Sequence, residues 1–348
     1  MRSSASILTL ALMAVAAGPL ATQALGQATG WVMPRTADGR PDLQGNWTNA
    51  TMTPIQRPEG VGLALPVDEV ERREQGRWDR IQRGAEASDP DREAPPVGGD
   101  GSTGAAGGVG GYNNFWIDAG NQVAMYNGEY RSSLIVDPPD GRYPPRTEAA
   151  RARIAERRAV RRQHGQYDNP ENRPLAERCI LSFGSNGGPP MLPNYFYNNN
   201  YTIVQTPDHI MIMTEMVHDV RIIRIGTPNP LPGEIEPYFG DSWGHWEGDT
   251  LVVETMNYHP TQIAQVGVFA GTSKDLKVTE RFTRADENTI NYEFTMEDPS
   301  TWTETWSGEV PFKRLPGQVY EYACHEGNYA LFNVLSGARA QERRDNGR

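Results

Sequence analysis

Two histidines occupy positions where acid/base groups are useful. His218 lies in an apolar run that we predict to be a strand, and His325 precedes Glu326 and Gly327 at the end of another predicted strand. An imidazole titrates near neutral pH and can shuttle protons. We therefore predict that His218, His325 and Glu326 are catalytic. The alternative for each histidine is a structural hydrogen bond to the main chain.

Tyrosine and asparagine side chains crowd the segment that starts at residue 194. Its sequence is Asn-Tyr-Phe-Tyr-Asn-Asn-Asn-Tyr, in which we predict a catalytic Tyr197 and the substrate-binding residues Tyr195 and Asn199. Phenol and amide groups both donate and accept hydrogen bonds, so they suit a hydroxyl-rich or phenolic ligand. The alternative is a tight loop in which the asparagines take left-handed backbone conformations.

Carboxylates recur on strand faces that are otherwise apolar. Strict alternation along the predicted strands places Glu254, Glu280 and Glu321 among apolar neighbours. A charged group in a dry interior is costly, so this pattern indicates either a ligand-filled lumen or pairing with an arginine. Arg221 and Arg281 are the candidate partners. We assign Glu254 and Arg221 to substrate binding.

The segment around residue 242 supplies further polar candidates. We assign Asp241 to catalysis and Trp243 to substrate binding, together with Asn328 near the C-terminus. The five residues from Gly240 to Gly244 also match the Gly-x-Ser-x-Gly elbow of serine hydrolases. We do not favour a hydrolase, because no strand–turn–helix pattern surrounds this match.

A metal site has weaker support than proton-transfer chemistry. No His-x-His, His-x3-His or Cys-x2-Cys spacing occurs in the chain, so we expect no cofactor. A divalent metal remains the alternative. Its candidate ligands are His218, His245, His259, His325, Asp241 and Glu326.

Composition indicates one folded core with irregular additions. The chain has 348 residues, of which 37% are hydrophobic, and its 36 glycines and 27 prolines favour loops. The net charge of −11 argues against nucleic acid or an anionic membrane as the partner. We expect a small-molecule ligand instead, and no membrane anchor.

The N-terminus is typical of an export signal. Residues 1–26 combine an early arginine, an apolar run too short to span a bilayer, and a small-x-small cleavage pattern. We therefore predict a periplasmic or secreted protein. In an oxidising compartment we expect Cys179 and Cys324 to form a disulfide, and the alternative is two buried free thiols.

Period-two alternation dominates the second half of the chain. Hairpin-length links and few helices predict a mainly β fold, an antiparallel β-barrel or sandwich, with a lipocalin-like barrel as one form. An irregular N-terminal arm and one or two helices complete it. The predicted strands are 201–206, 210–225, 250–257, 276–283, 289–296, 303–312, 319–324 and 330–334.

Helices and short strands are predicted before this core. Helices are expected over 67–81 and 147–163, the second capped by Thr147, and short strands at 115–118, 122–126 and 132–137. The six arginines of the second helix fit a polyanion patch or, more simply, a solvated face on an acidic protein. The predicted organisation is a signal peptide at 1–26, an irregular arm at 27–175 with a flexible Gly-rich loop at 84–111, an antiparallel β core at 176–340 and a disordered tail at 341–348.

Three long motifs stand out along the chain. They are Asp-Gly-Arg-Pro-Asp-Leu-Gln-Gly from residue 38, Gly-Asp-Ser-Trp-Gly-His-Trp-Glu-Gly-Asp-Thr-Leu-Val-Val from residue 240, and Tyr-Ala-Cys-His-Glu-Gly-Asn-Tyr from residue 322. Together they resemble a large family of secreted bacterial proteins of uncharacterised function, over nearly the whole chain after residue 26. The resemblance implies a periplasmic location. It brings no activity or catalytic residue with it.

These observations favour one function and leave two alternatives. The favoured function is a periplasmic enzyme of lyase, isomerase or hydratase type, which performs acid/base chemistry on a small aromatic or sugar-derived compound. The first alternative is a non-catalytic periplasmic binding protein whose lumen holds an apolar or phenolic ligand. The second alternative is a structural protein of the cell envelope.

Overall fold

The fold is described by a computed structural model of the chain. The described residues are 30–86, 91, 93, 117–182, 187–261 and 271–347. The chain divides into two units, Met1–Trp31 and Val32–Arg348, and all helices and strands named below belong to the second. The predicted signal peptide and most of the predicted loop at 84–111 lie outside the described residues.

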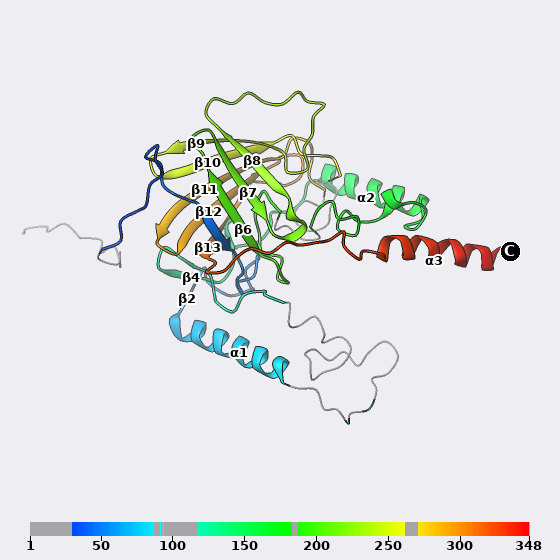
Figure 1. The fold of residues 1–348 in the computed structure, drawn as a ribbon, viewed down its shortest axis with the longest axis horizontal. Helices are drawn as coiled ribbons and strands as arrows, with labels where there is room; N and C mark the ends of the chain where they lie inside the picture. The colour runs from blue at the N-terminus through cyan, green and yellow to red at the C-terminus, as the bar shows by residue number, and fades with distance from the viewer. Residues whose placement is uncertain are drawn as a thin grey trace, which may run out of the picture. The chain divides into compact units, whose positions relative to one another are not determined.

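Nine strands close into a β-barrel (Figure 1). The first strand pairs with its neighbours on both sides, β6 and β13, which completes the ring. Neighbouring strands are antiparallel except β8 and β9, which are parallel. Of the predicted barrel or sandwich, the barrel is confirmed, and its one departure from the predicted antiparallel order is the pair of β8 and β9. The strands are β1 (Gly45–Thr48), β6 (Asn200–Gln205), β7 (His209–Thr214), β8 (Val220–Ile225), β9 (Asp241–Glu247), β10 (Thr250–Met256), β11 (Lys277–Asp286), β12 (Thr289–Glu297) and β13 (Trp306–Arg314).

Further elements surround the barrel. Thr147 caps α2 as predicted, because its hydroxyl accepts a hydrogen bond from the N–H of Ala150 at 3.1 Å. No described helix is long and apolar enough to cross a bilayer. The elements are β5 (Ile135–Asp137) beside β13, a sheet of β2 (Ala64–Leu65), β4 (Glu129–Arg131) and β3 (Met125–Tyr126), the helices α1 (Val67–Ala85), α2 (Glu148–Gln163) and α3 (Ala330–Asp345), and the short 3-10 helices η2 (Pro170–Asn172) and η3 (Met216–His218).

Aromatic side chains fill the described interior of the barrel. Ring centroids lie 5.0 Å apart for Phe282 and Tyr292, 5.2 Å for Tyr292 and Phe312, and 5.5 Å for Phe294 and Trp306. These rings are at most 1% exposed, and such contacts stabilise a core beyond simple burial of apolar area. We therefore look for a ligand site at an end of the barrel and not along its axis.

The predicted strand over 210–225 is wrong as a continuous element. It breaks into β7, η3 and β8, and Val217 has a left-handed φ of 66° at the break. The helical turn changes the alternation, so Arg221 points inward and is buried while Ile222 points outward and is 49% exposed. Strict alternation from Ile210 through an unbroken strand would have placed Arg221 on the opposite side.

Five further points of the sequence prediction need correction. Residues 319–324 form no strand, and α3 occupies both the predicted strand at 330–334 and most of the predicted disordered tail. Leu331, Val334 and Leu335 recur at helical spacing, which explains the helix. β9 was missed, and β1 joins the barrel from the predicted irregular arm.

The hairpin of β3 and β4 docks on the outer face of β12 and β13 through carboxylates. Tyr126 donates a hydrogen bond to Glu293, and Arg131 donates one to Glu309 at 2.7 Å and one to the exposed Glu129 at 2.8 Å. The strand register places Glu293 opposite Glu309. Burial raises the pKa of Glu309 above its ordinary value; Arg131 opposes this rise and the charge of Glu293 adds to it.

Replacing Glu309 with glutamine should change how stability depends on pH. The raised pKa means that the folded state holds this proton more tightly than the unfolded state does. The resulting stabilisation is complete below the ordinary pKa of 4.5 and is lost as pH rises through the folded-state pKa. Urea denaturation should therefore show the free energy of unfolding of Glu309→Gln increasing relative to the native chain from about pH 4 to about pH 7.

Glu129→Gln is the matched control, because it removes a charge beside the same arginine at an exposed position. Its difference from the native chain should change less over the same pH range than that of Glu309→Gln, because the charge of Glu129 is the smallest of the influences on the pKa of Glu309. A native chain that gains stability over Glu309→Gln as pH rises would contradict the assignment.

Candidate functional site

One end of the barrel gathers most of the polar residues that sequence analysis selected. We call it the Asn200 end, because β6 begins there at Asn200. The strand register places the end of β1, the end of β7 and the start of β8 at the same level. Since β9 runs parallel to β8, β9 also starts there, and Met256 at the end of β10 pairs with Asp241.

Residues 191–199, which we call the capping segment, are fixed at this end by one buried asparagine. The main-chain N–H of Asn49 donates to the carbonyl of Asn199 at 3.1 Å, and its side-chain amide donates to the carbonyl of Met191 at 3.0 Å. The same amide lies 3.1 Å from the hydroxyl of Tyr201. Asn49 is 0% exposed, so it holds both ends of the capping segment from inside the fold.

An ion pair is buried in the barrel beside the capping segment. Arg221 on β8 and Glu280 on β11 join through two hydrogen bonds, one of them 2.9 Å long, and their side chains are 3% and 0% exposed. Tyr292 donates its hydroxyl proton to Glu280 and accepts a hydrogen bond from the N–H of Met191, both at 2.9 Å. The ion pair is therefore connected to the start of the capping segment.

The tyrosines beside this pair stay protonated. Burial raises the pKa of Tyr292 and of Tyr258 well above the ordinary range, and the negative charge of Glu280 adds to both shifts. A protonated phenol can donate a hydrogen bond but cannot act as a base at neutral pH. Because Arg221 is also enclosed, we assign it a structural role and not the predicted substrate contact.

The side chain of Tyr197 in the capping segment lies close to Tyr322 in the C-terminal part of the chain. Burial, followed by the influence of Tyr197, raises the pKa of Tyr322. Phe196 packs edge-on against Tyr197 with the ring centroids 6.5 Å apart, and its side chain is 50% exposed. Aromatic side chains from two distant parts of the sequence thus meet at the Asn200 end.

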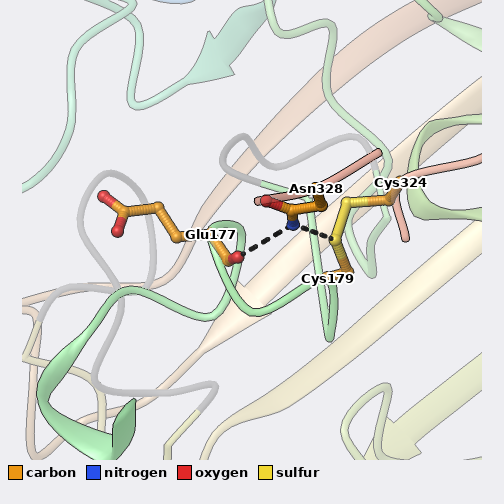
Figure 2. Close-up of a disulfide and its surroundings, with 4 residues drawn as sticks. All are labelled: Glu177, Cys179, Cys324 and Asn328. Carbon is orange, nitrogen blue, oxygen red and sulfur yellow. Dashed lines mark hydrogen bonds between the residues drawn. A yellow bond between two sulfur atoms is a disulfide. The ribbon is translucent and has the colours of Figure 1, made fainter. Parts of the chain in front are cut away.

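A disulfide fixes the C-terminal turn beside this pair (Figure 2). Cys179 and Cys324 are bonded, with their Cα atoms 5.7 Å apart, which confirms the predicted bridge. The side-chain amide of Asn328 lies 3.2 Å from the sulfur of Cys179 and 3.5 Å from the carbonyl of Glu177. Cys324 before the turn and Asn328 after it are therefore both held against the segment around Cys179.

His325 and Glu326 lie in this turn and not at a strand end. Both are exposed. Tyr197 lies close to Tyr322, three residues before His325. Four predicted site residues (Tyr197, His325, Glu326 and Asn328) therefore belong to two segments that meet at the Asn200 end. Exposure leaves the imidazole accessible to a small molecule.

His218 ends η3, which contacts the capping segment through its first residue. The sulfur of Met216 accepts a hydrogen bond from the hydroxyl of Ser182 at 2.9 Å and lies 3.6 Å from the amide of Asn194. The backbone of His218 is therefore at the Asn200 end. Its side chain lies outside the described atoms, and its catalytic role stays a prediction.

Asp241 lies at the same end of the barrel but is already bonded. Its carboxylate pairs with Arg224 and accepts a hydrogen bond from the N–H of Leu231 at 2.8 Å. The guanidinium of Arg224 lies 4.1 Å from the ring centroid of Trp243. Asp241 and Trp243 thus form a cluster on the outer face of β8 and β9, with structural partners of its own.

Three other predicted binding residues also have structural partners. The hydroxyl of Tyr195 donates to the carbonyl of Thr53 at 2.8 Å. Asn199 is 1% exposed and accepts a hydrogen bond from the N–H of Asn194 at 3.0 Å. Glu254 is on the outer face of β10, paired with Lys277 at 2.8 Å, so its predicted place on an apolar inner face is wrong.

The residues that hold the segments of this end together were not predicted from the sequence. Tyr322 lies in the motif around Cys324, and its position there was the one available signal. Tyr292 is one of many inward residues of an alternating strand. The alternation does not show that its hydroxyl has a hydrogen-bonding role. Asn49 forms hydrogen bonds to residues about 150 positions away in the sequence, so no local pattern predicts its role.

The described residues contain no group of three or more His, Cys, Asp or Glu side chains placed to hold a metal ion. Two open hollows of about 540 and 520 Å³ lie along α1. Glu71 and Gln75 line both hollows, and none of the predicted site residues lines either.

Breaking the buried ion pair should strongly destabilise the barrel. Arg221→Met leaves the carboxylate of Glu280 buried without its partner, and a loss of about 3–5 kcal/mol in the free energy of unfolding is expected. The double variant Arg221→Met with Glu280→Leu removes both charges and should recover much of that loss. Urea denaturation of the two variants tests this, and equal stability of the single and the double variant would refute it.

Comparisons with protein families, with curated proteins and with solved structures find no match to this chain. The resemblance of its motifs to a family of secreted bacterial proteins therefore stays a prediction. The function of the chain is inferred from the residues at the Asn200 end.

Proposed function

We propose that this chain binds a small phenolic or sugar-derived molecule at the Asn200 end. The observation that supports this most is the proximity of the Tyr197 and Tyr322 side chains, which is close enough for Tyr197 to raise the pKa of Tyr322. These two phenols come from separate segments that meet at the Asn200 end. A ligand hydroxyl can bond to either of them, because each phenol both donates and accepts.

Nearby side chains supply the apolar and amide contacts that such a ligand needs. Phe196 is half exposed beside Tyr197, and the rings of Tyr320 and Tyr329 are 74% and 71% exposed near Tyr322 in the sequence. Aromatic rings offer a large contact area and lose little conformational entropy on binding. The amide of Asn328, held beside the disulfide, adds a polar group of fixed position.

A second candidate function is acid/base catalysis at the same place, of lyase, isomerase or hydratase type. It is favoured by the position of His325, three residues after Tyr322 in the turn pinned by the disulfide. An accessible imidazole can accept a proton from a bound ligand or donate one to it. Glu326, next to it in the same turn, is a second group of this kind.

A location outside the cytoplasm is part of this proposal. The disulfide supports it, because such bonds persist in oxidising compartments and are rare in the cytosol. The resemblance to secreted bacterial proteins points the same way. We place the protein in the periplasm or the medium, where phenolic and sugar-derived compounds are accessible to it.

A thermal-shift screen of phenols and sugar derivatives tests binding. A ligand at a hundredfold excess over its Kd should stabilise the native chain by about 2.7 kcal/mol. Tyr197→Phe and Tyr322→Phe each remove one hydroxyl and should weaken binding about tenfold, the value of a hydrogen bond of roughly 1.4 kcal/mol. Tyr167→Phe is the matched control, since Tyr167 is a partly exposed tyrosine in a different loop.

The same ligands distinguish binding from catalysis. If the chain is an enzyme, His325→Ala should abolish product formation while the ligand still stabilises the variant. If it only binds, no product forms with the native chain. Ligand affinities that are equal in the native chain and in both Tyr→Phe variants would refute the site.

A further inference from the structure

The surface of α2 differs in charge from the rest of the chain. The helix carries six arginines and two glutamates within 16 residues, on a protein whose net charge is −11. The arginines are Arg151, Arg153, Arg157, Arg158, Arg161 and Arg162. A solvated face on an acidic protein would be expected to pair with nearby carboxylates.

Three of these arginines share one side of the helix. Arg158 and Arg162 follow Arg151 by 7 and 11 residues, which are about two and three turns of an α-helix. All three are exposed, and they extend roughly 16 Å along the helix axis. We call these three residues the arginine stripe.

Within the described part of the chain, no carboxylate pairs with the arginine stripe. None of the ion pairs found between described residues includes Arg151, Arg158 or Arg162. Arg151 bonds to a main-chain carbonyl, that of Arg146. On α1, by contrast, Arg72 and Arg73 both pair with Glu69.

The inner side of α2 is positively charged as well. Arg153 is anchored by the carbonyls of Gly271 and Ser300, at 3.0 and 2.9 Å, and by no carboxylate among the described residues. Burial lowers the pKa of Arg157, and the charges of Arg153 and Arg161 lower it further. Such crowding of like charges produces a positive potential that an external anion would relieve.

We infer that the arginine stripe binds an acidic polysaccharide through its carboxylate or sulfate groups. Arginine forms paired hydrogen bonds with such planar or tetrahedral anions. A flexible polyanionic chain can follow α2 alone and avoid the acidic remainder of the surface. An anionic membrane is an extended surface, so it would also contact the acidic remainder of the protein surface and be repelled by it.

The sequence of α2 argues against the other polyanions. Its 16 residues include no aromatic side chain on which the bases of single-stranded nucleic acid could stack. Its exposed side has Val160 as the one large apolar residue, whereas a helix that lies in a membrane needs a continuous apolar face. This inference is independent of the ligand proposed for the Asn200 end.

Binding of fluorescently labelled polygalacturonate, followed by anisotropy, tests the inference on the full chain. The native chain should bind, with an affinity that falls as salt is added. The triple variant Arg151→Gln, Arg158→Gln and Arg162→Gln should bind about tenfold more weakly, because three exposed ion pairs of roughly 0.5 kcal/mol each are lost. Thermal denaturation verifies that the variant is folded.

The matched control is the triple variant Arg72→Gln, Arg80→Gln and Arg83→Gln on α1, which removes the same charge from exposed positions. It should keep the native affinity. Equal losses in both triple variants, or no binding by the native chain, would overturn the inference. Stripe-dependent binding of single-stranded DNA or of phosphatidylglycerol vesicles that is tighter than that of polygalacturonate would also overturn it.

Discussion

The hydrogen-bonded ion pair of Arg221 and Glu280 is the interaction on which the Asn200 end depends. Both charges lie inside a barrel packed with aromatic rings, where an unpaired charge is costly, so each side chain requires the other in one geometry. The pair links β8 to β11, and Tyr292 extends it to β12 and to the main chain of Met191. The position of the capping segment is therefore tied to the registry of the barrel itself.

Two further constraints make this end rigid. Asn49, just after β1, holds both ends of the capping segment, so a residue from the first barrel strand positions a segment that comes much later in the sequence. The disulfide holds the turn that contains His325 against the segment around Cys179. The core and the disulfide thus fix the aromatic and amide groups at the surface. Precise ligand contacts require such support.

Local patterns predicted a barrel or a sandwich with most of its strands, and the export signal predicted the disulfide, but neither predicted the site. Alternation in β10 to β13 and the cap at Thr147 depend on neighbours in the sequence, and both were predicted. The 3-10 turn at η3 interrupts the alternation between β7 and β8. Arg221 therefore lies on the side opposite to the one that an unbroken strand would give it. Asp241 and Glu254 looked like free acids because their partners, Arg224 and Lys277, are brought close only by strand pairing. Side-chain partners across strands are a property of register, and register is not visible from one strand.

The disulfide encloses eight of the nine barrel strands in a covalent loop. Cys179 precedes β6 and Cys324 follows β13, and the two cysteines are 145 positions apart in the sequence. A protease that cuts the backbone once in any connection from β6 to β13 therefore releases no fragment, because the two pieces remain one molecule through the sulfur–sulfur bond. Surface loops of this barrel can be nicked without loss of the C-terminal turn, until a reductant separates the halves.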